Sequence, residues 1–137
     1  MHRIMAAGAI LAGTLLAGGL GYAAGSAAHE HIRPVFTAKL PNVPGKSLTA
    51  ILVSYAPGGR SGPHHHAGSV LAYVVSGAIR SQNSATGPAR VYRAGEAFFE
   101  PPGSEHLISE NASRTAPASL LAVFVADTGA KLTTFDH

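Results

Sequence analysis

The sequence of 137 residues contains no cysteine and no tryptophan, and only 12% of its residues are Asp, Glu, Lys or Arg. The absence of cysteine excludes a disulfide framework. The charged fraction is about half the usual share of about 25%. The ten basic residues form no block, whereas a nucleic-acid surface needs clustered Lys and Arg. We therefore expect no nucleic-acid partner.

Acidic residues are missing from the first 29 positions, which are rich in Ala, Gly, Leu and Ile. A basic start at His2 and Arg3 is followed by an apolar run and by the small residues Ser26, Ala27 and Ala28. This order is typical of a secretory signal peptide. The run also approaches the roughly 20 residues of a membrane-spanning helix, so an uncleaved anchor is the alternative. We predict a signal helix over residues 1–28 and a periplasmic or secreted protein that meets the membrane only if the helix stays attached.

Sustained helical periodicity is absent from the rest of the chain. Short β-branched and aromatic runs alternate instead with Gly, Pro, Ser and Asn, which predicts a single all-β domain over residues 29–137, closed as a barrel or built from two sheets. The segments 48–55 and 120–126 are nearly all apolar, so we expect both of their faces to be covered. The predicted strands are Ile32–Leu40, Ser47–Tyr55, Val70–Ser76, Ala78–Asn83, Ala89–Arg93, Ala97–Glu100, His106–Ser109, Leu120–Ala126 and Lys131–Phe135.

Aromatic residues make up only 7% of the sequence. We expect Tyr55, Tyr73, Phe98 and Phe99 to lie in the core, because large aromatic side chains usually supply much of the buried apolar area.

Three consecutive histidines follow a Gly/Pro-rich turn in the stretch GGRSGPHHHAGS, residues 58–69. In a strand, His64 and His66 share one face and His65 points to the other. Two neutral imidazoles on one face can bind a metal ion at about 2.0–2.1 Å. Taken alone, the pattern is weak evidence for a metal and favours a solvated histidine cluster.

A second segment, residues 94–113, favours the metal interpretation. Its Pro-Pro-Gly turn is followed by His106, which opens a predicted strand. With this segment the chain resembles the cupin superfamily. Gly58, His64, His66 and Gly77 match the family's first motif, and Gly95, Pro101, Gly103 and His106 match its second.

The resemblance implies a jelly-roll barrel, the double-stranded β-helix, with a metal in its interior. It implies that His64, His66 and His106 bind one divalent ion. Neutral imidazoles suit Fe, Mn, Ni, Cu and Zn alike. Three protein ligands leave positions open for water or substrate, which is typical of a catalytic site.

The sequence departs from the cupin pattern at the acidic ligand. Family spacing places this ligand at Val70, which has the inward parity but cannot bind a metal. Glu100, immediately before the Pro-Pro-Gly turn, can replace it as a fourth ligand or act as a general base. Strand parity cannot be carried across the turn, so an exposed charge at the end of a strand is the alternative.

The fold alone does not decide the reaction, because cupins include dioxygenases, isomerases, lyases and storage proteins. Our first interpretation is an exported, metal-dependent oxidoreductase of the quercetinase-like dioxygenase type. Its substrate would be a small oxygenated or aromatic compound, with Glu100 as the catalytic residue. The alternative is a non-catalytic periplasmic cupin that holds a metal or a small ligand. Many cupins pair through an edge strand or a sheet face, so the resemblance also implies a homodimer.

Cleavage after Ala28 is the first testable prediction, since the small residues there follow an apolar run without charge. Mass spectrometry of the exported protein should show a mature chain that begins at His29. A full-length species that is extracted only by detergent would show a membrane anchor instead.

Overall fold

The computed structural model describes residues 29–137, which form eleven strands and no helix. The signal helix that we predict for residues 1–28 lies outside the described residues and stays a prediction. Within residues 29–137, no helix is long and apolar enough to cross a membrane.

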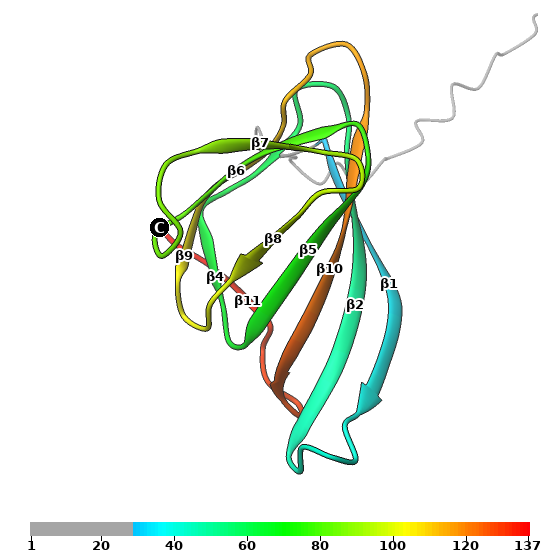
Figure 1. The fold of residues 1–137 in the computed structure, drawn as a ribbon, viewed down its shortest axis with the longest axis vertical. Helices are drawn as coiled ribbons and strands as arrows, with labels where there is room; N and C mark the ends of the chain where they lie inside the picture. Colours follow the sequence, from blue (N-terminus) through cyan, green and yellow to red (C-terminus); the bar gives the residue numbers. More distant parts are fainter. Residues whose placement is uncertain (1–28) are drawn as a thin grey trace, which may run out of the picture.

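The strands form two antiparallel sheets that face each other (Figure 1). The first contains, in spatial order, β1 (Glu30–Lys39), β2 (Lys46–Tyr55), β10 (Ala118–Asp127), β5 (Ser69–Ser76) and β8 (Ala97–Glu100). The second contains β11 (Thr133–Phe135), β4 (His64–His66), β9 (Glu105–Asn111), β6 (Ala78–Asn83) and β7 (Arg90–Arg93), with β3 (Arg60–Ser61) also paired to β9. The predicted all-β jelly-roll is confirmed for these residues.

Each of the nine predicted segments overlaps a strand, and β3 and β4 are additional. These two strands span two and three residues, respectively, and are separated by Gly62 and Pro63. Strands this short carry too little composition to be recognised from the sequence. Their pairing with β9 defines them: Ser61 lies opposite Ser109, and His64 lies opposite His106.

The core lies between the two sheets and is built mainly from the inner faces of β2, β5 and β10. Tyr55 and Phe98 belong to it, as predicted, but Tyr73 and Phe99 do not, because their side chains are 44% and 51% exposed. The core residues are Val53, Tyr55, Val70, Ala72, Val74, Ile79, Phe98, Ala118, Leu120, Ala122 and Phe124.

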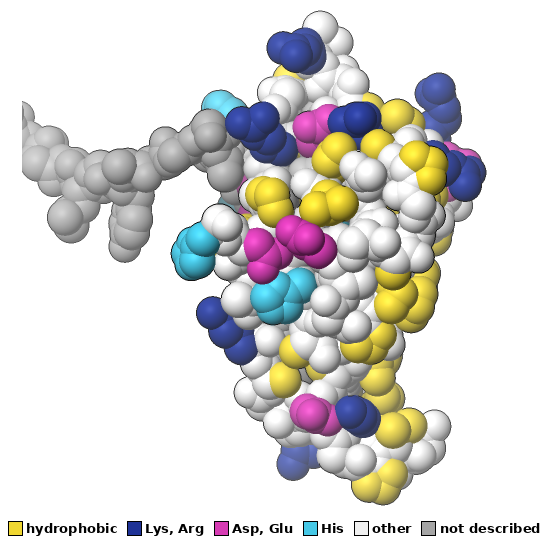
Figure 2. All heavy atoms as spheres, turned by 90° about the vertical axis from the view of Figure 1, so that its left-hand side faces the viewer, with side chains coloured by type: hydrophobic (Ala, Val, Ile, Leu, Met, Phe, Trp, Pro, Cys, Tyr) yellow, Lys and Arg dark blue, Asp and Glu magenta, His cyan; other side chains and the backbone are white. Residues whose placement is uncertain are grey.

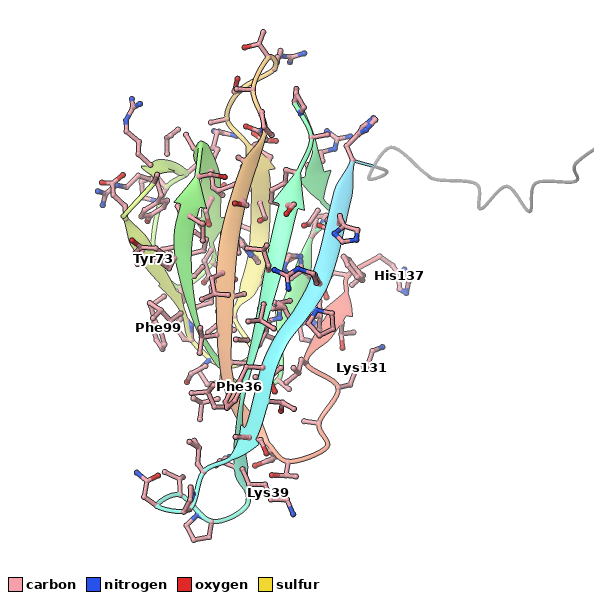
Figure 3. All side chains as sticks on the ribbon, turned by 90° about the vertical axis from the view of Figure 1, so that its right-hand side faces the viewer. Phe36, Lys39, Tyr73, Phe99, Lys131 and His137 are labelled. Carbon is pink, nitrogen blue, oxygen red and sulfur yellow. The ribbon has the colours of Figure 1, made fainter. Side chains whose placement is uncertain are left out.

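The outer face of the first sheet is apolar; it is partly covered on β2 and β10, the strands that we expect to be covered on both faces, and exposed on the strands beside them. On β5, the exposed Leu71, Tyr73 and Val75 alternate with fully buried neighbours. Phe36 on β1 and Phe99 on β8 extend the same face (Figure 3). Hydrophobic side chains gather along the right-hand edge of Figure 2, while charged ones are scattered over the face turned to the viewer. Exposed apolar patches of this kind mark interaction surfaces.

Candidate metal centre

Three imidazoles meet in the interior, between the two sheets. His64 and His66 point inward from β4 and are buried, and His106 on β9 lies directly opposite His64. The ring centre of His64 lies 4.8 Å from that of His66 and 4.9 Å from that of His106. His65 points the other way, as expected, and its Nδ1 lies 2.7 Å from Oδ1 of Asp136.

The turn between β8 and β9 is tied to the histidine strand. Gly103 has a φ of 73°, in the left-handed region that glycine adopts without steric cost. Its backbone N–H donates to the carbonyl oxygen of His66, over 2.9 Å. The turn therefore holds the end of β8 and the start of β9 beside His66, and these ends carry Glu100 and His106.

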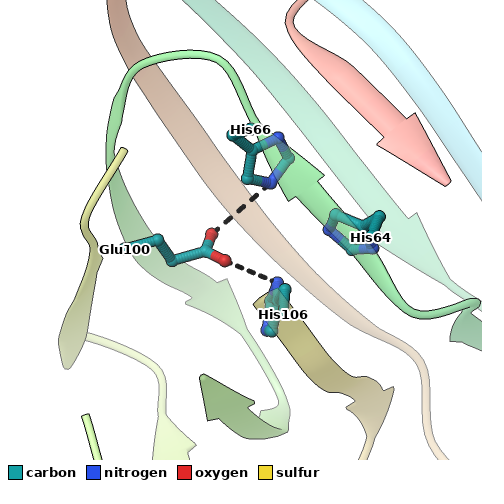
Figure 4. A group of neighbouring side chains, drawn as sticks. All are labelled: His64, His66, Glu100 and His106. Carbon is teal, nitrogen blue, oxygen red and sulfur yellow. Dashed lines mark ion pairs between the residues drawn. The ribbon is translucent and has the colours of Figure 1, made fainter. Parts of the chain in front are cut away.

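Glu100 points into the group of imidazoles (Figure 4). Its side chain is almost fully buried. Its Oε1 lies 2.8 Å from Nδ1 of His106 and its Oε2 lies 3.7 Å from Nε2 of His66. Of the two alternatives left by the sequence, the structure shows the inward one.

The register of β5 and β8 explains how Glu100 reaches this place. Val70 on β5 and Glu100 on β8 are directly paired, and both side chains are buried on the inner face. Paired residues of antiparallel strands present their side chains on the same side of the sheet, about 4.5–5.5 Å apart. Glu100 therefore places a carboxylate beside Val70, the position that the cupin pattern assigns to the acidic ligand.

Two of the imidazoles are oriented by backbone carbonyls. Nδ1 of His64 lies 2.7 Å from the carbonyl oxygen of Gly62, and Nδ1 of His66 lies 3.1 Å from that of Leu132. A carbonyl oxygen only accepts, so each Nδ1 carries the hydrogen and each Nε2 keeps a free lone pair. Hydrogen bonds of this kind orient the histidines of metal sites.

His106 offers its other nitrogen. Its Nε2 lies 2.8 Å from Oγ of Ser81, and its buried Nδ1 has no hydrogen-bond partner, because the nearby Glu100 is not aligned for one. This Nδ1 lies 2.8 Å from Oε1 of Glu100, so a cation bound between the two groups would contact both.

These nitrogens and the Glu100 carboxylate together fit a metal ion. One ligand atom from each of His64, His66, Glu100 and His106 lies within 4.8 Å of the others. Ligands bound at about 2.1 Å lie at most about 4.2 Å apart, so a small movement of the side chains closes the site. Imidazole and carboxylate ligands suit several divalent transition metals, and the ligand set does not select one.

The sequence did not indicate the partners of the imidazoles. The three residues that contact the ring nitrogens, Gly62, Ser81 and Leu132, lie far apart in the sequence. None of them belongs to a motif that would mark it as a partner of a histidine. Two of them act through backbone carbonyls, which any residue supplies, so only the strand register reveals them.

Burial governs the protonation of the site. It lowers the pKa of His64 and of His66, because the charged form of a buried imidazole is poorly solvated. Burial alone would raise the pKa of Glu100, but His106, His66 and His64 outweigh it and hold this pKa below its usual value. The site thus favours neutral His64 and His66 beside an ionised Glu100, the protonation states that metal ligands need.

The metal-free protein should lose stability as the pH falls. Below about pH 6.5 the unfolded chain takes up protons on His64 and His66 that the folded chain resists. Below about pH 4.5 Glu100 adds a further loss, because it too is protonated first in the unfolded chain. Thermal unfolding midpoints recorded between about pH 8 and pH 4 test this.

The double variant His64→Gln, His66→Gln serves as the matched comparison. Its unfolding midpoint should fall less than that of the original protein on going from about pH 7 to about pH 5.5. A midpoint that rises over this interval in the metal-free protein would contradict the protonation states assigned above.

Similar proteins place the site in a known family. The model of the family described as Cupin domain matches residues 51–124, which include all four residues of the site. No curated protein matches the sequence at a significant level. Solved structures do match, at identities that show the fold alone.

Three of these structures show how identity, structural similarity and coverage vary among the matches. Oxalate oxidase in complex with glycolate is 23% identical, with a TM-score of 0.60, and the match covers 78% of this chain and 55% of that one. An uncharacterised Klebsiella pneumoniae protein with a double-stranded β-helix domain is 19% identical, with a TM-score of 0.61 and coverage of 80% and 85%. The DMSP lyase DddQ from Ruegeria pomeroyi DSS-3 is 19% identical, with a TM-score of 0.56 and coverage of 64% and 42%.

The chain thus spans about half the length of the oxalate oxidase and lyase chains and most of the Klebsiella protein. Its two-sheet fold and the match over residues 51–124 lead to the same conclusion. The chain belongs to the cupin family.

Proposed function

We propose that the protein binds one divalent transition metal ion through His64, His66, His106 and Glu100 and acts with it on a small oxygen-containing compound. The observation that carries the proposal is the convergence of three oriented imidazoles and one buried carboxylate on a single point. The buried Nδ1 of His106 supports it, because it faces the Glu100 carboxylate at 2.8 Å and an ion between them would bind both.

A bound ion would act as a Lewis acid that polarises an oxygen atom of the ligand. The chain supplies the rest. Gly62, Leu132 and Ser81 hold the three rings in their orientations. Phe98, Leu120 and Phe124 give the cavity an apolar wall beside them. Glu100 either completes the ligand set or, held ionised beside His106, takes a proton from the bound compound.

The inward position of Glu100 favours an enzyme over a purely binding protein. A carboxylate that only held charge at the surface would leave a bare three-histidine site, which fits the alternative, a non-catalytic periplasmic cupin, better. In the structure Glu100 lies within reach of two imidazoles. An oxidoreductase of the dioxygenase type remains the activity that we propose to test first.

The cavity limits the size of the substrate. Its volume is about 50 Å³, measured as the space open to the centre of a water molecule. Together with its mainly apolar walls, this small volume favours a small oxygenated compound over a polycyclic one. That the oxalate oxidase structure is a complex with glycolate, a compound of this size, is consistent with the proposal.

Exchanging Val70 and Glu100 tests the displaced carboxylate. Glu100→Val should lower the affinity for a divalent metal by about 10–100-fold, the scale seen when groups that orient a metal site are removed. Adding Val70→Glu should restore most of it, because the two positions are cross-strand partners on the inner face. Competition titration with a coloured chelator measures both affinities.

The single variant Val70→Glu is the control for this exchange. It places a second buried carboxylate beside Glu100, so it should lower the stability of the metal-free protein. A double variant that binds metal no better than Glu100→Val alone would refute the role given to Glu100. Screening of metal-loaded protein against small hydroxy acids, enols and phenols, with Glu100→Gln as the comparison, tests the enzyme proposal itself.

Export and self-association remain proposals for this chain. We place the protein in the periplasm or outside the cell because of residues 1–28. We propose a homodimer through the outer face of the first sheet, where Leu71, Tyr73 and Phe99 are exposed together. A two-fold axis on a sheet face pairs the same patch of both subunits, so a single apolar patch is sufficient.

Light scattering coupled to size exclusion should show a dimer for residues 29–137. Leu71→Lys and Tyr73→Lys should each shift it to a monomer, because a lysine would be buried without a partner. Val91→Lys is the control, since Val91 is 41% exposed on the other sheet. A monomeric unsubstituted protein, or dissociation by Val91→Lys alone, would contradict the proposed interface.

A further inference from the structure

A second polar group lines the same cavity as the metal ligands. It consists of Tyr55 on β2, Ser61 on β3, Ser109 on β9 and Glu30 on β1, and we call it the hydroxyl cluster. The Tyr55 hydroxyl lies 2.5 Å from Oγ of Ser61 and 2.9 Å from Oγ of Ser109. Ser61 in turn donates to Oε2 of Glu30. The four side chains join both sheets around one buried phenol.

The order of donors in the hydroxyl cluster is fixed by Glu30. A carboxylate only accepts, so the single hydroxyl hydrogen of Ser61 is used on Glu30. The Tyr55 hydroxyl must therefore donate to Ser61, and Ser109 must donate to the oxygen of Tyr55. All three hydroxyl hydrogens are then occupied within the cluster.

What the hydroxyl cluster offers to a ligand follows from this order. Only oxygen lone pairs remain free, on Ser109, Tyr55, Ser61 and the Glu30 carboxylate. Burial raises the pKa of Tyr55 to about 12, so the phenol keeps its proton at neutral pH and the order persists. A hydroxyl or ammonium group can donate to these lone pairs. A carboxylate or phosphate finds no donor and meets the negative charge of Glu30.

The hydroxyl cluster and the metal ligands lie at two places in one cavity. His106 and Ser109 are three residues apart on β9, and both line the cavity, a distance of up to about 10 Å in a strand. The wall between them on the facing sheet is apolar, formed by Val53, Leu120 and Ala122. A short molecule can therefore reach both polar groups.

We propose that the hydroxyl cluster binds a hydrogen-bond-donating group of the substrate, an alcohol or an amine, while the oxygen end of the same molecule faces the metal ligands. The substrate class is then a small compound with a metal-binding oxygen group, a short apolar middle and a hydroxyl or amine at the other end. This deepens the proposed function and rests on it for the metal-facing end, but the donor preference of the hydroxyl cluster does not depend on metal.

The first experiment uses the metal-free protein, with tyrosine rings labelled with carbon-13. It is titrated at neutral pH with butan-1-ol, butylamine and butanoate and followed by NMR, with the Tyr55 signal assigned through Tyr55→Phe. The alcohol and the amine should shift the Tyr55 signal and butanoate should not. A shift with butanoate alone, or with none of the three, would overturn the donor-binding role of the hydroxyl cluster.

The second experiment uses zinc-loaded protein and calorimetry. Straight-chain acids of four to six carbons are compared with the ω-hydroxy acids and the dicarboxylic acids of the same length. The hydroxy acid of the best length should bind about 2- to 10-fold more tightly than the plain acid, the effect of one net hydrogen bond. The dicarboxylic acid should bind most weakly.

Variants separate recognition from packing. The ratio between hydroxy acid and plain acid should fall to about one in Tyr55→Phe and in Ser109→Ala, two changes whose thermal unfolding is measured in parallel. Tyr92→Phe, which changes a tyrosine that packs on Phe98 outside the cavity lining, should keep the ratio. An unchanged ratio in both cluster variants would reduce the hydroxyl cluster to a structural tie. A protein that binds none of the divalent ions of Fe, Mn, Ni, Cu and Zn would refute the proposed function, while the metal-free titration would still decide the role of the cluster.

Discussion

The pairing of β4 with its two neighbours is the interaction on which the site depends. This strand has only three residues, and it is held between β9 and β11, with His64 opposite both His106 and Phe135. The pairing with β9 brings the third imidazole to the first two. The pairing with β11 brings the carbonyl of Leu132 to His66, so one short strand sets both the position and the tautomer of the ligands.

Backbone hydrogen bonds rather than side-chain packing fix the positions of Glu100 and His106 relative to His66. The hydrogen bond from Gly103 to the carbonyl of His66 fixes the turn that carries Glu100 and His106. Positive φ at Gly103 excludes most other residues there, since side chains rarely adopt this conformation. The glycine of the second motif therefore helps to build the candidate metal centre, although it offers no ligand.

The sequence was sufficient for the parts of the account that depend on local pattern. Alternation predicted that His64 and His66 share a face and that His65 does not, and the apolar runs predicted every strand except the short β3 and β4. The place of Glu100 could not be predicted, because it depends on the register between β5 and β8, which pairs it with Val70. The exposure of Tyr73 and Phe99 was missed for a related reason: an apolar outer face and an apolar inner face look alike in a strand sequence.

Two polar groups that are separate in the sequence, the candidate metal ligands and the hydroxyl cluster, line the same cavity. At one place oriented imidazoles and a carboxylate offer lone pairs to a cation, and at the other the hydroxyl cluster offers lone pairs to a hydrogen-bond donor. The apolar wall between them leaves few other polar groups with which a ligand could interact.

The central claim is that β4 and β9 present one metal site with the register seen in the structure. Elemental analysis of protein purified from its own compartment tests it most directly, in the original protein, in His106→Ala and in His65→Ala. The account predicts about one divalent ion per chain in the original and in His65→Ala, and little or none in His106→Ala. Equal loss of metal from both variants would contradict the register, and an original protein that holds no divalent metal even after loading would contradict the site itself.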